Sequence, residues 1–408
     1  MIKSQRLAVA ASKAGLVLVS LIVGLLLIEL AARFLKPPYQ GGDELHRCDR
    51  LLGWKGNPNT SVTQNTDGYQ HTVTWNSQGM HDRDYSFDKP DGVFRILVLG
   101  DSFVEAQQVE EIQTNHHVLE ETLNGRAPGN LKFEVISGAI RAWGPAQQLI
   151  YFRSLGRFYQ PDLVVLLWLP ANDLTNVLPY DRLTGAGGTN CYFPYFALCE
   201  GQFDPEPWFP APGFAPTWKI CSPAQKQVSN VLNYLYHHSR LYQQLEPILA
   251  RNSSRIDYAN PFIPWLPQEA DDDALRYAYQ LTDQIIFHLS DEAKQIGAKA
   301  ALVIVPFNVA VQGDVEASYA QSLEQTVKAE TGLTVNPTLP NQRFTALMQR
   351  RNLPVLDLHP IFVEAARAGG EALYWPVDPH WTVAGNRLAG ETIAHWLIEQ
   401  KLVPVAEK

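Results

Sequence analysis

Short apolar runs alternate with longer amphipathic stretches through most of this chain. The strand-like runs are Arg95–Leu99, Phe133–Ile136, Leu163–Trp168, Ala300–Val305 and Val355–Asp357. The stretches with helical periodicity are His116–Leu123, Ala146–Phe158, residues 271–296, Arg343–Arg350 and Thr382–Gln400. Leu163–Trp168 is apolar throughout, which is typical of a parallel strand buried on both faces. The alternation predicts an α/β fold in which helices cover both faces of a parallel sheet.

Two regions depart from this alternation. Residues 37–93 are polar and predict turns and short strands that lead into the main domain, residues 94–408. Residues 178–270 form an insertion rich in Pro and aromatic residues, with helical periodicity over 224–250. Its aromatic residues include Tyr192, Phe193, Tyr195, Phe196, Trp208, Phe209, Phe214 and Trp218. They indicate either a lid or sugar-stacking wall or, as we favour, a small core that holds the insertion down.

The N-terminal residues 1–36 contain a long apolar segment. From Ala14 to Leu30 the only charged residue is Glu29, and the run is long enough to span a bilayer as a helix. Basic residues precede it, which predicts a cytoplasmic N-terminus and a domain on the periplasmic side of the inner membrane. A cleaved signal peptide is the alternative, but the apolar core is long for one and no A-x-A site follows.

Charge and cysteine content narrow the classes of partner. The 408 residues carry a net charge of −9, which argues against a nucleic-acid surface, and 46% are hydrophobic, enough for a full core. None of Cys48, Cys191, Cys199 and Cys221 forms a C-x-x-C pair, which argues against zinc and against thioredoxin-like chemistry. We expect no metal and no cofactor. A disulfide within residues 191–221 would suit an oxidising compartment, whereas free buried thiols are an equal alternative, so the pairing stays open.

Candidate catalytic side chains follow the ends of the predicted strands. Ser102 follows the first run, Asn172 lies in the loop that follows Leu163–Trp168, and Asp378 and His380 lie in a late loop. Ligands of parallel sheets bind outside the carboxyl ends of the strands. A serine, a histidine, a carboxylate and an amide donor are together the parts of an acyl-transfer site. Alone, Asp101-Ser102 would also suit a helix N-cap.

Three short motifs give the chain a family resemblance. They are Gly53-Trp54, Asn76-Ser77-Gln78-Gly79 and Gly100-Asp101-Ser102-Phe103. With them the chain resembles the SGNH, or GDSL-type, hydrolases, and in particular their membrane-anchored bacterial members, over about residues 50–175 and 280–400.

The resemblance implies a flavodoxin-like three-layer fold and assigns roles to the candidate residues. Ser102 would be the nucleophile, His380 the base and Asp378 the partner that orients His380. The oxyanion hole would consist of the backbone N–H groups of Ser102 and Ala139 and the side chain of Asn172.

Three positions differ from the usual family pattern. Ala139 occupies a position that is usually glycine, and Pro170-Ala171-Asn172-Asp173 lacks the glycine of its block. Asp378-Pro379-His380-Trp381 has one residue fewer between the carboxylate and the histidine than usual. The shorter form is similar to the polysaccharide O-acetylation relatives of the family and points to acylated glycans as substrates.

Two classes of function follow. The first is a membrane-anchored, extracytoplasmic serine esterase that removes O-acyl groups, such as acetyl, from an envelope or exported polysaccharide, or an O-acetyltransferase on the same substrates. The second is a non-catalytic glycan-binding or assembly protein that retains the fold. The intact set of catalytic residues favours the first class. We interpret Asp173 as ordering its own loop, and His116, His117, His237 and His238 as structural.

Overall fold

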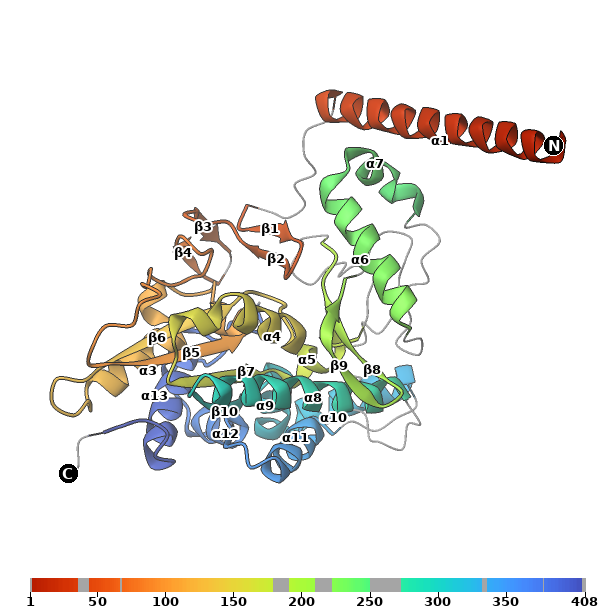
Figure 1. Cartoon of the computed structure of the whole chain (residues 1–408). Coiled ribbons are helices and arrows are strands. Elements are labelled where there is room, and N and C mark those ends of the chain that lie inside the picture. Colours follow the sequence, from red (N-terminus) through yellow and green to blue (C-terminus); the bar gives the residue numbers. More distant parts are fainter. Residues whose placement is uncertain are drawn as a thin grey trace.

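A five-stranded parallel sheet forms the centre of the molecule (Figure 1). The computed structural model describes residues 2–35, 44–66, 68–178, 191–209, 222–249, 273–331, 336–376 and 378–405. The strands are β5 (Val93–Gly100), β6 (Lys132–Ala139), β7 (Leu163–Trp168), β10 (Lys299–Ile304) and β11 (Val355–Asp357). Their order is β11-β10-β7-β5-β6, which is the flavodoxin-like order. The predicted parallel α/β sheet is therefore confirmed.

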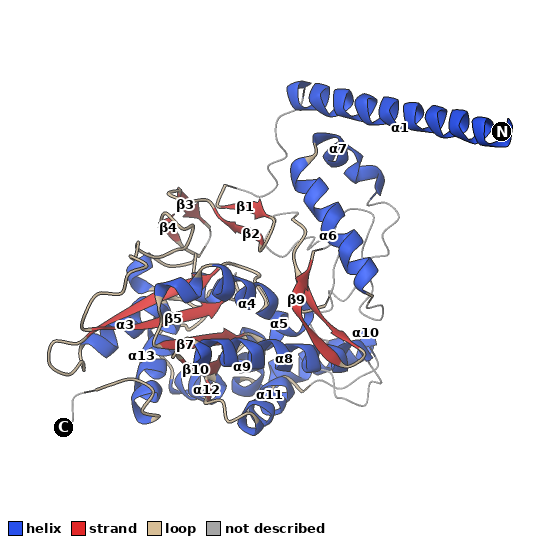
Figure 2. Ribbon diagram, viewed as in Figure 1, coloured by secondary structure: helices blue, strands red, loops and turns tan. Residues whose placement is uncertain are grey.

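Helices cover both faces of the sheet, as Figure 2 shows, because alternate residues of each strand point to opposite sides. Leu97 of β5 and Leu166 of β7 join the apolar core on one face, and Val98 and Val165 join the core on the other. The first core also contains residues of α4 (Pro145–Ser154), α8 (Asp273–Gln295) and α11 (Leu339–Arg350). The second contains residues of α3 (Asn115–Asn124), α9 (Asn308–Val315), α12 (His359–Ala368) and α13 (Val383–Glu399). This is the expected three-layer arrangement.

Several local predictions need correction. Asn172 lies in the first turn of a helix, α5 (Pro170–Asn176), and not in a loop, because Pro170 suits the first position of a helix. The helix predicted over Ala146–Phe158 ends at Ser154 and is followed by a 3-10 turn, η2 (Gly156–Tyr159). The short helices α9 and α12, and α10 (Ala317–Thr331), were not predicted, because no long apolar stripe marks them.

The N-terminal extension consists largely of two hairpins, β1 (His46–Asp49) with β2 (Gly53–Gly56), and β3 (Ser61–Asn65) with β4 (Gln70–Thr74). The motif glycines allow the segments to pack closely. A Cβ on Gly56 would lie 2.0 Å from the carbonyl oxygen of Gly79, and Gly79 itself has a φ of +81°. The Asn-Ser-Gln-Gly motif thus packs directly against β2 of the same extension.

The insertion pairs β8 (Tyr195–Cys199) with β9 (Gln202–Trp208) and continues through helices α6 (Pro223–His238) and α7 (Arg240–Leu249). The helical stretch predicted over 224–250 is thus two helices, because Ser239 between them is extended. Five of its aromatic residues are buried, namely Tyr192, Phe193, Tyr195, Phe196 and Trp208. The packing interpretation is confirmed for these residues, whereas Phe214 and Trp218 lie outside the described residues.

The N-terminal segment is one long helix, α1 (Ile2–Leu35). Its stretch Ser12–Leu35 has 24 residues, a mean hydropathy of 2.6 and no part buried in the protein. By length and composition this helix could cross a bilayer, and a signal sequence would share the same pattern.

A disulfide joins the extension to the insertion. Cys48 of β1 is bonded to Cys191, at a sequence separation of 143 residues. Cys199 is also disulfide-bonded, and Cys221 lies outside the described residues. Cys191 therefore pairs with a cysteine outside residues 191–221, and the alternative of free thiols is not found among the described cysteines.

We predict that the double change Cys48→Ala and Cys191→Ala lowers the free energy of unfolding by about 2–5 kcal/mol, because the bridge restricts a long loop of the unfolded chain. Denaturant unfolding of the full chain measures the change, with Thr63→Ala on the exposed side of β3 as a control. Equal midpoints for the double variant and the control would contradict a stabilising role for this bridge.

Candidate active site

The turn after β5 presents Ser102. Helix α2 (Ser102–Glu105) starts within two residues of the strand end, and Asp101 caps it by accepting the backbone N–H of Phe103 at 2.9 Å. A Cβ on Gly100 would lie 2.5 Å from a methyl group of Val104, so only glycine allows this tight return. The N-cap interpretation is thus correct for Asp101, and it leaves the hydroxyl of Ser102 free for another partner.

That partner is His380. Its Nε2 lies 2.7 Å from Ser102 Oγ, although the two residues are 278 positions apart. The Nδ1 of His380 is hydrogen-bonded to Asp378 Oδ1, which also accepts the backbone N–H of His380 at 3.0 Å. The side chains of His380 and Asp378 are 22% and 20% exposed, so solvent reaches them. The three predicted residues therefore form a hydrogen-bonded chain from carboxylate to hydroxyl.

Two further side chains hold the second oxygen of Asp378. The hydroxyl of Tyr69 donates to Asp378 Oδ2 at 3.2 Å, and the amide of Gln108 donates to it at 3.3 Å. Burial raises the pKa of Asp378, but the hydrogen bonds and charge of His380 outweigh burial and hold that pKa below its usual range. Burial, together with the adjacent charge of Asp378, raises the pKa of Tyr69 to about 12, so the phenol remains a donor at neutral pH. Nothing in the sequence indicated these two residues.

The remaining predicted site residues surround the same strand ends. Asn172 Nδ2 donates one hydrogen bond to Asp101 Oδ2 at 3.0 Å, and an amide nitrogen carries a second hydrogen that a ligand could accept. Ala139 ends β6 beside Gly100, is fully buried, and does not have a positive φ. Asp173 accepts the backbone N–H of Leu169 at 2.8 Å, which fits its predicted ordering role.

The turn that carries Ser102 packs on a buried carboxylate, that of Glu105 at the end of α2. Its oxygens contact His46 Nε2 at 2.9 Å, and they accept hydrogen bonds from the Gln107 amide and the Arg141 backbone N–H, both at 2.7 Å. Its carbonyl oxygen lies 2.7 Å from Nδ1 of His81. Burial raises the pKa of Glu105, but the charge and hydrogen bond of His46 dominate and lower it. The extension, through His46 and His81, thus supports the turn that carries Ser102.

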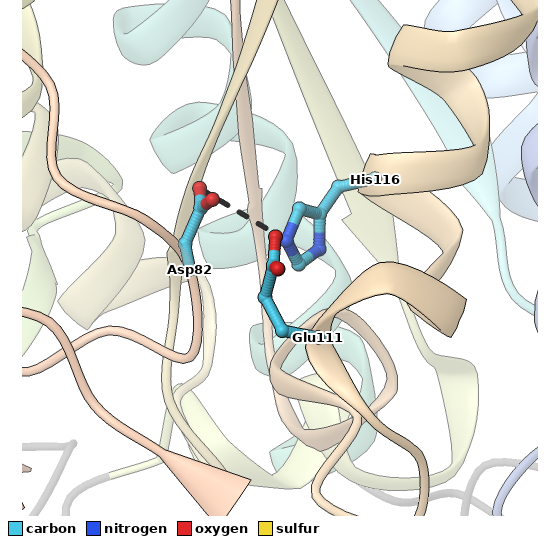
Figure 3. Close-up of side chains that lie close together, drawn as sticks. All are labelled: Asp82, Glu111 and His116. Atoms are coloured by element: carbon cyan, nitrogen blue, oxygen red, sulfur yellow. Dashed lines mark ion pairs between the residues drawn. The ribbon is translucent and has the colours of Figure 1, made fainter.

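One group of side chains offers donor atoms suited to a metal ion. Asp82, Glu111 and His116 bring one such atom each within 4.8 Å of one another, and Figure 3 shows them converging. Sequence reasoning did not connect His116 with Asp82, because Asp82 approaches His116 only through the fold of the extension.

The hydrogen bonds that Asp82 accepts are enough to explain this group of side chains as a structural one. Its oxygens accept the backbone N–H groups of Ser137 at 2.8 Å and Arg83 at 2.7 Å. Asp82 thereby fastens the extension to β6. Burial lowers the pKa of His116 to about 3, which keeps this imidazole neutral at physiological pH.

A scan against protein-family models finds no match, and a search of curated proteins finds none. Among solved structures, the chain is similar to an acetylxylan esterase from Geobacillus stearothermophilus, with a TM-score of 0.39 and 11% identity, over 77% of this chain and 97% of that one. It is also similar to the lipase/acylhydrolase from Enterococcus faecalis, with a TM-score of 0.35 and 11% identity, over 77% of this chain and 100% of that one. TM-scores in this range are too low to assign an activity to the chain.

We predict that Tyr69→Phe slows the reaction of Ser102 with a fluorophosphonate several-fold, because Asp378 loses a donor while the ring stays packed on Trp375. A net hydrogen bond to a charged group contributes about 1.5–3 kcal/mol, which sets the upper limit of the effect. Labelling rates measure it, with Tyr234→Phe on the exposed side of α6 as the matched control. Equal rates for the two variants would show that Tyr69 does not position the triad.

Proposed function

We propose that this protein is a serine esterase in which Ser102 is the nucleophile, His380 the general base and Asp378 the residue that orients the base. The observation that carries the proposal is the 2.7 Å contact between His380 Nε2 and Ser102 Oγ, with Asp378 on the far side of the ring. A serine hydroxyl becomes a useful nucleophile only when a base can take its proton, and this arrangement supplies one.

The reaction follows from this geometry. Ser102 Oγ attacks the ester carbonyl while its proton passes to His380 Nε2, and Asp378 stabilises the resulting imidazolium. The negative oxygen of the tetrahedral intermediate would be met by the N–H groups of Ser102 and Ala139 and by the amide of Asn172. The intermediate collapses, the alcohol leaves with the proton from His380, and water then hydrolyses the acyl-enzyme by the same steps in reverse.

We propose an O-acylated polysaccharide of the cell envelope, or one that is exported, as the substrate, with the chain anchored by α1. The short Asp-x-His-Trp block, which resembles that of polysaccharide O-acetylation proteins, supports this substrate class. The length and composition of Ser12–Leu35 support the anchor, and the Cys48–Cys191 disulfide fits an oxidising, extracytoplasmic compartment.

Full-length protein in detergent, given acetylated oligosaccharides and simple acetyl esters, tests the proposal. We predict that Ser102→Ala and His380→Ala each lower turnover at least about 10³-fold while the fold is preserved, because nucleophile and base act as a unit. Ser61→Ala, on the exposed side of β3, should retain full turnover. Two results would reject the esterase. One is turnover at the wild-type rate by Ser102→Ala, and the other is no turnover of any ester by the folded wild-type protein. Transfer of acetyl to an added sugar in preference to water would identify an acyltransferase with the same site.

We predict a smaller and different loss for Asn172→Ala. The change removes one oxyanion donor, so kcat should fall by about 10²–10³-fold, while slow labelling of Ser102 by a fluorophosphonate persists. The comparison of steady-state turnover with labelling separates this effect from loss of the nucleophile. An unchanged kcat would mean that Asn172 serves only to hold Asp101.

A further inference from the structure

Helices α6 and α7 carry exposed apolar side chains on one face in the described part of the chain. This α6–α7 face consists of Val228, Val231, Tyr234, Leu235, Leu245 and Ile248, of which Ile248 is 62% exposed. On α6 the spacing of Val228, Val231 and Leu235 places them along one side. The residues that α6 buries include the polar Ser229 and Asn233. This distribution is opposite to that of a helix whose outer side faces water.

The same corner of the insertion is bound to the end of α1. Glu29 accepts the backbone N–H groups of Arg240 at 2.9 Å and Leu241 at 3.0 Å, and so satisfies the first turn of α7. The hydroxyl of Ser239 also donates to Glu29, at 2.8 Å, and Arg33 donates to the carbonyl oxygen of His238 at 2.8 Å. The single charge in the apolar run of α1 is thus used to hold α7.

These contacts place the end of α6 and the start of α7 beside the apolar helix. Figure 1 shows α7 next to α1, and α6 extends from there away from α1, roughly crosswise to it. Glu29 lies within the apolar stretch Ser12–Leu35, near its C-terminal end. At a rise of about 1.5 Å per residue, a residue six positions before the end of a helix lies only about 9 Å from it. A bilayer spanned by α1 therefore has its surface close to α6 and α7.

We propose that the α6–α7 face lies in the interface of the bilayer that α1 spans, as a second membrane contact of this chain. This inference rests on the membrane anchor of the proposed function. Exposed aliphatic residues and a tyrosine on short helices suit the boundary between headgroups and acyl chains. Lipid is the occupant that the bonds of Glu29 favour, because they tie this face to a helix whose own surface requires lipid.

The contact would also fix the orientation of the catalytic domain. Tyr236 of α6 packs against Tyr192, with ring centroids 5.2 Å apart, and the neighbouring Cys191 is bonded to Cys48 of the extension. The same strand, β1, carries His46, which contacts Glu105 at the end of α2, the helix that begins with Ser102. A continuous set of contacts thus links the proposed membrane contact to the active site, so the domain would meet its substrate in one orientation.

Site-specific fluorescence on the full-length protein tests the proposal. The fluorophore NBD is attached to Ile248→Cys, Leu26→Cys or Phe158→Cys, since the described native cysteines are in disulfides and do not react. The proteins are reconstituted in phosphatidylcholine–phosphatidylglycerol vesicles with or without lipids that carry doxyl quenchers at a shallow and at a deep acyl position. Position 26 reports on the anchor, and position 158 is an equally exposed apolar control in η2, outside the α6–α7 face.

We expect NBD at positions 26 and 248 to lose most of its fluorescence with quencher lipid, and NBD at position 158 to keep it. Quenching at 26 with none at 248 would overturn the second contact and leave the anchor standing. No quenching at 26 would instead reject the anchor itself. Oxidative cross-linking of Ile248→Cys between two copies, without quenching, would show that a second copy covers this face and would also overturn the proposal.

Discussion

The buried hydrogen bond between Glu105 and His46 is the interaction on which the turn that carries Ser102 depends. Helix α2 has four residues, too few to be stable without tertiary contacts. Glu105, its last residue, is fully buried, and its carboxylate is satisfied by His46, Gln107 and the Arg141 backbone. Removing His46 would leave a buried carboxylate oxygen without this partner, and a buried polar group left unsatisfied costs about 1–3 kcal/mol. The N-terminal extension is therefore part of the machinery that presents Ser102, and not merely a spacer after α1.

A second set of contacts brings the C-terminal loop to that turn. Asn115 Nδ2 donates to the carbonyl oxygen of Phe103 at 2.7 Å and to Asn386 Oδ1 at 2.9 Å, so one buried amide links α3 and α13 to the residue after Ser102. Asn386 lies in the first turn of α13, directly after the loop that carries Asp378 and His380. The parallel strand order places the carboxyl ends of β5, β6 and β7 on one side of the sheet. The amide link brings the loop that carries His380 to the turn after β5.

The sequence predicted what local patterns encode. Apolar runs gave the strands of the sheet, and Leu163–Trp168 was predicted to the residue, since continuous apolar character marks a strand buried on both faces. Ser102, Asp378 and His380 stood out because short motifs carry them. Tyr69, Gln108 and the His46–Glu105 pair act only through contacts between distant segments, and ordinary polar residues with no pattern give no signal. For the same reason the sequence left the partner of Cys191 open and placed Asn172 in a loop.

The central claim is that Ser102 carries the acyl group as a covalent intermediate during turnover. Rapid mixing of the full-length protein with an activated acetyl ester, an acid quench within the first turnover and mass-spectrometric mapping of the peptides would locate the acyl group directly. The proposed mechanism predicts an acetylated peptide that contains Ser102, formed at the rate of the first turnover and lost as the ester is exhausted. An acyl group on any other residue at that rate, or turnover without a covalent intermediate, would contradict it.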